Sequence, residues 1–492
     1  MSNCASSTLR NAGVLTVLVT AVLGSGCASP VAYVRPADPA QARYSQSPVD
    51  VKTPVIGPAD GSILRVSLGD GPPDAWWTLL GSEQINRMVA MALERNQSLA
   101  SAQAHLAAAR ERIRAARGAW YPQLDATAAV QRTRYGAPVL GSLARDFPPF
   151  SAYAAGPTVS YDFDMFGGTS SRVEQAAASA QYASAQLDAV ALSLTGNVVI
   201  EALQIATLRA QIRVVEGIIA DDEHSLTLVR AAHEAGAVSQ MDVLSAQSQT
   251  DHDRTLLPPL QQDLSVAQDV LSSLIGAAPS DWTAPDVDMS QLKLAENLPI
   301  ALPSELVHRR PDIGAAEAQL HAASASLGIA TANLYPHFSL TAAVGEQGLL
   351  GGPSETAWNV LGGLATPMFH GGTLTAERRA AQDEYRAAFA AYQQTVLEAF
   401  SQVAAALQAL GNDAASLSTQ QQALESAGAS LSLTRQAYAA GNAGYVQVLD
   451  AQRLHEQAQL GEVQANSQRY VDAVKLLMAA GGRVDSSHGD QQ

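Results

Sequence analysis

The sequence predicts a mainly α-helical protein with a small membrane β-sheet, built from two copies of one structural plan. Two Ala/Gln/Leu-rich segments, at about 169–235 and 373–440, follow a helical pattern for far longer than the helices of ordinary globular domains. Short segments between the helices alternate apolar and polar residues, which is typical of membrane strands with lipid on one face and water on the other. Motifs of the first half recur in the second, which indicates a duplication.

The first 26 residues predict a secretory signal peptide. Arg10 precedes an apolar run of about a dozen residues, which is too short to span a bilayer as a helix. Leu23-Gly-Ser-Gly-Cys27 resembles a bacterial lipobox, although its leucine lies one place further from the cysteine than is usual, so we expect covalent lipid on Cys27. The non-acidic Ala28 favours sorting to the outer membrane. The alternative is an ordinary cleavage site with an incidental cysteine.

Composition and charge exclude several classes of protein. The only other cysteine, Cys4, is lost with the signal peptide, so the mature chain cannot form an internal disulfide. A net charge of −16 argues against a nucleic-acid partner, which would require clustered Lys and Arg. After Cys27 no 18 consecutive apolar residues occur, so we expect no transmembrane helix.

The predicted helices follow a Pro-rich, lipidated N-terminal tether, which we place at residues 27–73. The helices are expected at about 82–118, 169–235, 239–275, 304–334, 373–440 and 445–480. Alanine, the best helix former, also allows helices to approach closely, so coiled-coil-like packing is expected. Residues 482–492 are expected to form a disordered C-terminal tail. A cytosolic coiled coil or a repeat solenoid is the alternative, and the signal peptide and the strands count against both.

The duplication is clearest around two glycines 205 residues apart, Gly236 and Gly441. Each glycine ends a long helical pattern and is followed by the motif Val-Leu-x-Ala-Gln, and Tyr121-Pro122 recurs as Tyr335-Pro336. We therefore divide the chain into a first structural repeat, 74–295, and a second, 296–481. Each repeat is predicted to contain a helix, two strands, a long helix, a turn and a further helix.

Four strands are predicted, near residues 123–131, 158–164, 337–344 and 358–366. Loops at about 136–152 and 346–356 are expected outside the cell. Four strands cannot close a barrel around a channel, and lipid does not tolerate open sheet edges, so several protomers must pool their strands. The polar side chains that we expect to face the barrel lumen are Thr127, Thr158, Asp162, Ser339 and Thr341.

Several motifs together resemble the TolC-like outer-membrane efflux proteins, particularly the lipid-anchored, NodT-type branch that serves multidrug pumps. The resemblance covers about 76–481 and rests on Asp74-Ala-Trp-Trp77, Arg309-Arg-Pro-Asp-Ile313, Ala316-Glu-Ala-Gln-Leu320, Asp162-Phe-Asp-Met-Phe-Gly167, Tyr335-Pro336 and the paired glycine turns. It implies a homotrimer whose 12-stranded β-barrel, with four strands per protomer, continues into a long α-helical barrel reaching into the periplasm. It also implies an outer-membrane location, passive conduction of drugs or other small molecules, a periplasmic adaptor protein and an inner-membrane pump.

The same resemblance implies a gated periplasmic entrance. Gly236 and Gly441 would form the tip turns, because glycine suits a helix end in the left-handed conformation. Asp242 and Asp450 match carboxylates that ring the constricted entrance in the family, and the alternative is that each only favours a helix N-terminus. Gln447 stands where some relatives carry a second aspartate. Tyr438 matches a tyrosine that bonds a neighbouring helix in the closed state, and a plain packing role is the alternative.

No enzyme motif occurs in the sequence, so we expect no catalytic residues, no metal site and no cofactor besides the covalent lipid. His252, between Asp251 and Asp253, has the chemistry of a metal ligand, but a polar helix face is the preferred interpretation. Arg309 to Asp312 is interpreted as a helix cap. The alternatives to a channel are a structural outer-membrane lipoprotein with a coiled-coil stalk and, less favoured, the periplasmic adaptor itself.

Overall fold

The computed structural model describes residues 33–37, 39, 43–44, 65–69, 71–134, 148–295 and 297–484. These residues belong to two compact units, which are described separately. The strand unit consists of Ala107–Gln181 and Glu317–Ala391 with the N-terminal residues up to Arg35. The helical unit consists of Pro36–Leu106, Tyr182–Ala316 and Tyr392–Gln492. The expected signal peptide, Cys27 and most of the expected disordered tail lie outside the described residues.

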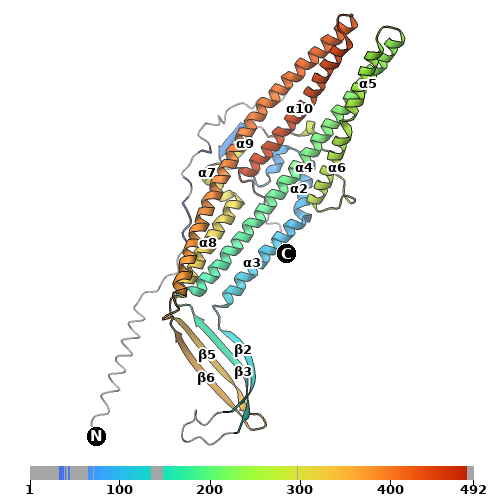
Figure 1. Cartoon of the computed structure of the whole chain (residues 1–492). Helices are drawn as coiled ribbons and strands as arrows, with labels where there is room; N and C mark the ends of the chain where they lie inside the picture. The colour runs from blue at the N-terminus through green and yellow to red at the C-terminus, as the bar shows by residue number, and fades with distance from the viewer. Residues whose placement is uncertain are drawn as a thin grey trace, which may run out of the picture. The chain divides into compact units, whose positions relative to one another are not determined.

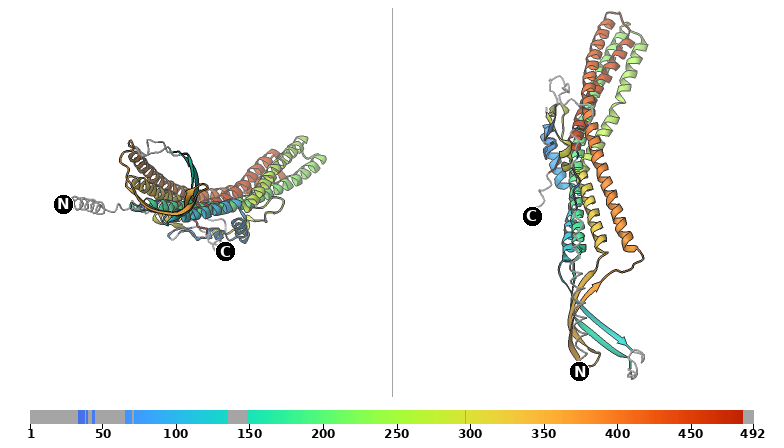
Figure 2. Two further views of the ribbon diagram at one scale, coloured as in Figure 1. Left: turned by 90° about the horizontal axis from the view of Figure 1, so that it is seen from below. Right: turned by 90° about the vertical axis from the view of Figure 1, so that its left-hand side faces the viewer.

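The strand unit contains one antiparallel sheet of four strands in the order β2-β3-β5-β6 (Figure 1). The strands are β2 (Gln123–Thr133), β3 (Phe150–Phe163), β5 (His337–Leu349) and β6 (Ser354–Ala365). Pairing of β3 with β5 joins the two repeats into one sheet, which is visibly curved in Figure 2. The expected loops were too long, because 150–152 belong to β3, and 346–349 and 354–356 belong to β5 and β6.

The strand unit also contains helix ends that flank these strands. Asp164 follows β3 and caps α4 (Gly168–Glu234), where the backbone N–H groups of Thr169 and Ser170 donate to its carboxylate over 2.9 and 2.8 Å. Across the repeats, the rings of Phe166 and Tyr335 stack with their centroids 4.8 Å apart. Phe166 of the first repeat and the Tyr335-Pro336 motif of the second therefore meet beside the sheet.

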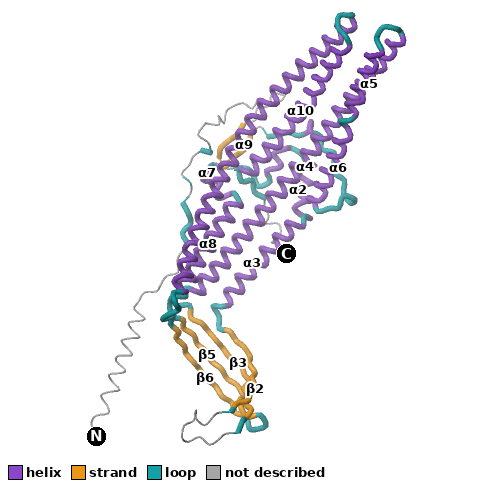
Figure 3. Tube along the Cα trace, viewed as in Figure 1, coloured by secondary structure: helices purple, strands orange, loops and turns teal. Residues whose placement is uncertain are grey.

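The helical unit is dominated by α4 and α9 (Thr373–Ala439), each of 67 residues, and by α10 (Tyr445–Ala479) (Figure 3). At 1.5 Å per residue, a helix of this length measures about 100 Å. The predicted bounds of all three helices differ from the observed ones by at most about two residues, within the usual uncertainty of a helix end. Their regular alanine-rich sequences explain this agreement.

The other predicted helices are each broken once in the structure. Asn96 separates α2 (Glu83–Arg95) from α3 (Gln97–Gly118), because its extended backbone ends one helix and its Oδ1 accepts from the N–H of Ser98 and Leu99. The turn before Pro258-Pro259 separates α5 (Gln240–Arg254) from α6 (Leu257–Ile275). Extended Arg310, which precedes a proline, separates α7 (Pro303–Arg309) from α8 (Pro311–Ala332).

One feature of the helical unit was not predicted from sequence. Strand β1 (Arg65–Gly69), in the expected tether, pairs in parallel with β4 (Asn297–Ala301). Two short 3₁₀ helices, η1 (Trp76–Leu80) and η4 (Met289–Gln291), are also present. The tether is therefore fixed to the start of the second repeat through backbone hydrogen bonds.

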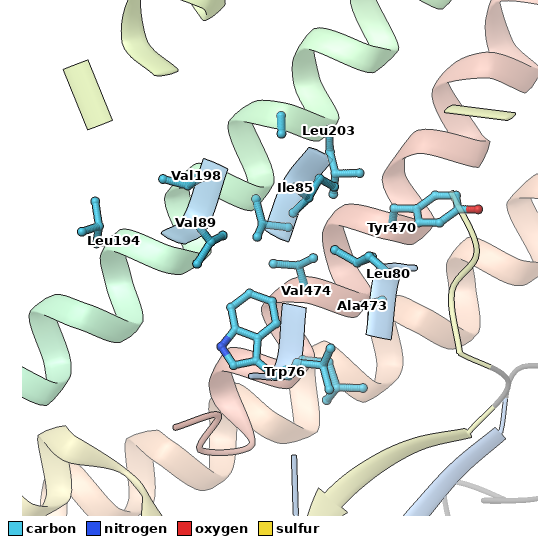
Figure 4. Close-up of a cluster of buried hydrophobic side chains, with 14 of the residues drawn as sticks. Trp76, Leu80, Ile85, Val89, Leu194, Val198, Leu203, Tyr470, Ala473 and Val474 are labelled. Atoms are coloured by element: carbon cyan, nitrogen blue, oxygen red, sulfur yellow. The ribbon is translucent and has the colours of Figure 1, made fainter. Parts of the chain in front are cut away.

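The core of the helical unit lies where both repeats meet (Figure 4). Trp76 and Leu80 of η1 are fully buried against Val198 and Leu203 of α4 and Val474 of α10. Burying such side chains stabilises a fold by roughly 1.5–3 kcal/mol each. The Asp-Ala-Trp-Trp motif therefore serves packing.

Among the described residues, α4 alone is long and apolar enough to cross a membrane by length and composition. Its most apolar 18-residue window is 56% buried inside the chain, which is typical of a core helix. The sequence expectation of no transmembrane helix is consistent with this burial.

Candidate functional site

Two matching turns close the helical hairpins α4–α5 and α9–α10 at one end of the helical unit (Figure 1). Gly236 and Gly441 adopt left-handed φ values of 75° and 78°. In each turn the residue after the glycine donates its N–H to a carbonyl five residues earlier, from Ala237 to Ala232 and from Asn442 to Ala437, both over 2.8 Å. These are the Schellman bonds that satisfy the last carbonyls of a helix.

An apolar cluster, which we call the tip cluster, packs the two hairpins together below these turns. The aromatic rings of Tyr438 and Tyr445 lie 5.6 Å apart and contribute to it from α9 and α10. The helices thus meet through an apolar surface, and the polar candidate residues lie around it. The buried members of the cluster are Leu226, Val229, Ala246, Leu431, Tyr445, Val448, Leu449 and Ala451.

Asp242 is engaged by its own helix. Its carboxylate accepts hydrogen bonds from the backbone N–H and the hydroxyl of Ser239, at 3.0 and 2.8 Å, and Ser239 Oγ in return accepts from the N–H of Asp242. This reciprocal pair is a capping box. The helix-start interpretation of Asp242 therefore has direct geometric support.

Asp450 differs from Asp242 because it lies in the second turn of α10, and the first turn holds no acidic residue. Its side chain is 62% exposed and forms an ion pair with Arg453 at 3.2 Å. An exposed pair of this kind contributes little to stability. The helix-start interpretation therefore does not apply to Asp450.

Tyr438 packs partly buried against the tip cluster and lies close enough to Asp242 for the carboxylate to affect it. Burial, and after it the charge of Asp242, raise the pKa of the Tyr438 hydroxyl. The two residues come from different repeats, Tyr438 from α9 and Asp242 from α5.

The strand pairing shows which strand residues share a face. Asp162 pairs with Ser339 and Ser160 pairs with Thr341, while Thr158 pairs with both Asp125 and Ala343. Because side chains alternate along a strand and cross-strand partners point the same way, one face is defined throughout the sheet. We call it the polar face, and it carries Thr127, Thr158, Asp162, Ser339 and Thr341.

The opposite face, which we call the apolar face, is made of large apolar side chains. Val159 pairs with Ala342, which pairs with Val360, and Phe163 pairs with Phe338, which pairs with Leu364. Most of these side chains are exposed in the single chain, including Leu124, Val130, Val159, Phe163, Leu340, Val344, Trp358, Val360 and Leu364. An exposed apolar band of this kind is what lipid would cover.

Arg310 anchors the start of α8. Its guanidinium, 8% exposed, donates to the carboxylate of Asp312 and to the carbonyl of Ala479 and the amide oxygen of Gln402. These partners lie on α8, α10 and α9, so the motif ties three helices together. The interpretation of this motif as structural agrees with this geometry.

Sequence reasoning missed a buried group of carboxylates formed by Asp222, Asp253 and Glu456. The sequence places Asp253 beside His252, but His252 is exposed whereas Asp253 is buried. Because neighbouring residues on a helix do not face one another, Asp251, His252 and Asp253 could not form one metal site. No local signal links the three acids, which come from three helices.

Comparison with known proteins gives one family. The model of the family described as "Outer membrane efflux protein" matches residues 88–277 and 302–482, one segment in each repeat. The toluene efflux pump outer membrane protein TtgF of Pseudomonas putida is 30% identical over 479 residues, which cover 94% of this chain and 95% of that protein. The probable outer membrane lipoprotein SilC of Salmonella typhimurium is 26% identical over 415 residues, 83% of this chain and 87% of that protein.

A solved structure is similar along nearly the whole chain. The outer-membrane channel OprN superposes with a TM-score of 0.82 at 25% sequence identity, covering 92% of this chain and 99% of that one. The chain therefore has the fold of a known outer-membrane channel.

Proposed function

Because the chain belongs to the outer membrane efflux protein family and is the outer-membrane channel of an efflux pump, we propose that three copies of it form one passive duct. Each copy would contribute its four strands to a closed barrel of twelve, wide enough for an aqueous bore because eight strands already enclose a filled interior. The protein is not an enzyme, so the energy for transport comes from its pump partners.

The observation that carries this proposal is the two-faced sheet with two open edges. In the described chain β2 and β6 are each paired on one side only. Unpaired backbone groups are not tolerated in lipid, so neighbouring copies must pair with both edges. Closure would place the apolar face in lipid and the polar face, with Thr127, Thr158, Asp162, Ser339 and Thr341, around the bore.

We assign the periplasmic constriction to the tip turns at Gly236 and Gly441 and the residues beside them. Asp450 is the stronger candidate for a charged ring, since its exposed carboxylate has no capping role. Asp242 would combine a capping role with a contribution to the ring, and Tyr438 would hold the two hairpins in the closed arrangement. Three copies of Asp450 in a narrow bore would attract cations and repel anions.

We further propose that Cys27 carries the lipid anchor. Tyr33 stacks on His321 of α8 with ring centroids 4.3 Å apart, and Arg35 pairs with Glu317 at 2.8 Å, so the start of the tether lies along α8. The relative SilC is described as a probable outer membrane lipoprotein, which supports a lipid anchor in this chain.

Cys27→Ala tests the anchor. The mass of the mature wild-type protein should exceed that of its polypeptide by the acyl chains, and the variant should lack this increase. Membrane fractionation of both proteins gives a second readout, in which the barrel alone should still retain part of the variant. An unmodified Cys27 thiol in the mature wild-type protein would rule the anchor out.

The exported compound and the partners are proposed only by class. Toluene appears in the name of TtgF and describes that relative. We propose that the duct accepts drugs or other small molecules delivered by an inner-membrane pump through a periplasmic adaptor, and that the pump selects among them.

Single-channel conductance in planar bilayers tests the duct and the constriction together. The wild-type protein should give small, cation-selective currents, and Asp450→Ala should enlarge the currents and weaken the selectivity. Arg453→Ala is the matched control, since it removes the partner charge but keeps the carboxylate. Currents that Asp450→Ala and Asp242→Ala leave unchanged would place the constriction elsewhere. Absence of current from a folded oligomer would favour the structural lipoprotein with a coiled-coil stalk.

A further inference from the structure

Three buried carboxylates converge in the helical unit, on the core side of the tip cluster. Asp222 comes from α4, Asp253 from α5 and Glu456 from α10, and one oxygen of each lies within 4.8 Å of the others. The three residues are 4%, 3% and 8% exposed. Carboxylates are rarely buried unless they are paired or bind a cation.

Hydrogen bonds satisfy only part of this acidic cluster. Gln452 donates its amide N–H to Asp222 Oδ1, and Gln249 donates to Asp253 Oδ2 over 2.7 Å. Asp222 Oδ2 and Glu456 Oε1 are buried and have no hydrogen-bond partner. A buried polar atom without a partner costs free energy, so binding a cation through these two oxygens would remove that cost.

Nearby cationic side chains do not complete the cluster. Arg254, next to Asp253 in the chain, pairs with Glu223 at 2.7 Å, and Arg453 pairs with Asp450. Burial raises the pKa of Glu456 more than the hydrogen bond from Gln452 and the charges of Arg453 and Arg435 lower it. Burial and the neighbouring acids likewise raise the pKa of Asp222 to about 8. The cluster therefore needs either a cation or a bound proton to offset its charge.

We propose that Asp222, Asp253 and Glu456 bind one hard divalent cation of the calcium type. Oxygens bound to one Ca²⁺ lie 2.3–2.6 Å from it and hence at most about 5 Å apart, which accommodates the observed spread. All donors are oxygens, which disfavours soft metals. Mg²⁺ requires tighter octahedral geometry and keeps its waters, so it should bind more weakly.

The bound cation would fasten the two hairpins to each other behind the tip. Two ligands come from the α4–α5 hairpin of the first repeat and one from α10 of the second. The duplication does not reproduce the cluster, because at the 205-residue offset the counterparts of Asp222 and Asp253 are Ala427 and Ala458. The site therefore occurs once per chain, and its existence does not depend on whether the chain conducts.

Calcium binding to the purified full-length protein in detergent tests the proposal. After removal of metal with EDTA, calorimetric titration with Ca²⁺ should give one site per chain, and Tb³⁺ should give luminescence sensitised by the nearby Tyr445. Asp222→Asn/Asp253→Asn should weaken Ca²⁺ binding at least about tenfold. Asp251→Asn, at an exposed acid two residues from Asp253, is the matched control and should bind as the wild type does.

Each other result overturns the proposal. A folded, metal-free wild type that binds no Ca²⁺ would mean that a proton offsets the cluster's charge. Binding that survives Asp222→Asn/Asp253→Asn would place the cation elsewhere. If the double variant does not fold, Glu456→Gln replaces it, and unchanged affinity in that variant has the same meaning.

Discussion

At the scale of single residues, the two tip glycines have a conformational role that no other residue type fills without strain. A Cβ added at Gly236 or Gly441 would meet no atom within 4 Å, so space is not the constraint. The constraint is the positive φ, which costs an L-residue roughly 1–2 kcal/mol. Glycine there fixes where each long helix ends.

Gly236→Ala should therefore destabilise the end of α4 by about 1 kcal/mol. Hydrogen exchange of peptides covering the first tip turn would show faster exchange in the variant. Gly217→Ala is the control, because Gly217 lies inside the same helix with open space around it, and alanine there should stabilise by up to about 1 kcal/mol. Equal effects of the two substitutions would contradict the role assigned to φ.

Two buried acids give the metal-free protein a pH-dependent stability. The folded state raises the pKa of Asp222 from 3.8 to about 8 and, through burial and the nearby Asp472, that of Asp413 to about 6. A raised pKa means that the folded state holds the proton more tightly than the unfolded chain does. Stability is then greatest below about pH 4 for these groups and is lost as the pH rises through the folded pKa values.

In EDTA, the melting temperature should fall as the pH rises from 5 to about 8.5. Asp413→Asn should reduce the slope between about pH 4 and 6, and Asp222→Asn should reduce it over the whole range from about pH 4 to 8. An unaltered slope above pH 6 in Asp222→Asn would show that this carboxyl does not titrate there.

At the scale of elements, the sheet has two different faces, and neighbouring residues on one strand belong to opposite faces. Val360 and Leu361 are neighbours on β6 and are 63% and 65% exposed, yet they belong to opposite faces. Val360 pairs with Ala342 on the apolar face, and Leu361 pairs with Thr341 on the polar face. Exposure alone therefore cannot distinguish a lipid contact from a lumen contact.

The same substitution at both positions separates the two environments. Val360→Lys should cost about 2–4 kcal/mol of insertion if it lies near the bilayer midplane, and should reduce the amount of protein in the outer membrane. Leu361→Lys should insert normally and shift ion selectivity towards anions. Quantitative blotting of membrane fractions and reversal potentials measure the two effects. Poor insertion of Leu361→Lys with normal insertion of Val360→Lys would reverse the assignment of the faces.

At the scale of the whole molecule, the described residues of a single chain leave both sheet edges open. Edge strands β2 and β6 belong to different repeats, so duplication within one chain widens the sheet but does not close it. Closure by several copies removes every edge, which is the arrangement that a bilayer requires.

Cysteine pairs across the edges test this closure. Ala128→Cys on β2 is combined with one further cysteine at a position between Ala357 and Leu361 of β6. At alternate positions along β6 the two cysteines should form disulfides between chains, which would give a covalent trimer on non-reducing gels. Ala128→Cys with Ala155→Cys is the control, because these residues pair within one chain and should leave a monomer band. A native mass equal to one chain in a folded preparation would contradict the oligomer.

Local pattern in the sequence was enough for much of the fold. The bounds of α4, α9 and α10, the presence of the four sheet strands and the left-handed glycines were predicted, because each depends on a repeating or left-handed local preference. Strand β3, however, begins eight residues earlier than expected. The breaks at Asn96 and Arg310 were not predicted: helical composition continues across Asn96, and Pro311, which follows the second break, was interpreted only as part of a helix cap. Strands β1 and β4 were missed because each is five residues long and its partner lies more than two hundred residues away.

Order along the chain was enough to predict the family, the duplication and the alternation of polar side chains, because all three are properties of the residue sequence. The tertiary structure decided which carboxylates act together. It assigned Asp242 to a capping box and Asp450 to an exposed pair, and it brought Asp222, Asp253 and Glu456 into one buried group. The physical reason is that electrostatic coupling depends on distance and burial in space, and helices from both repeats must pack before those distances exist.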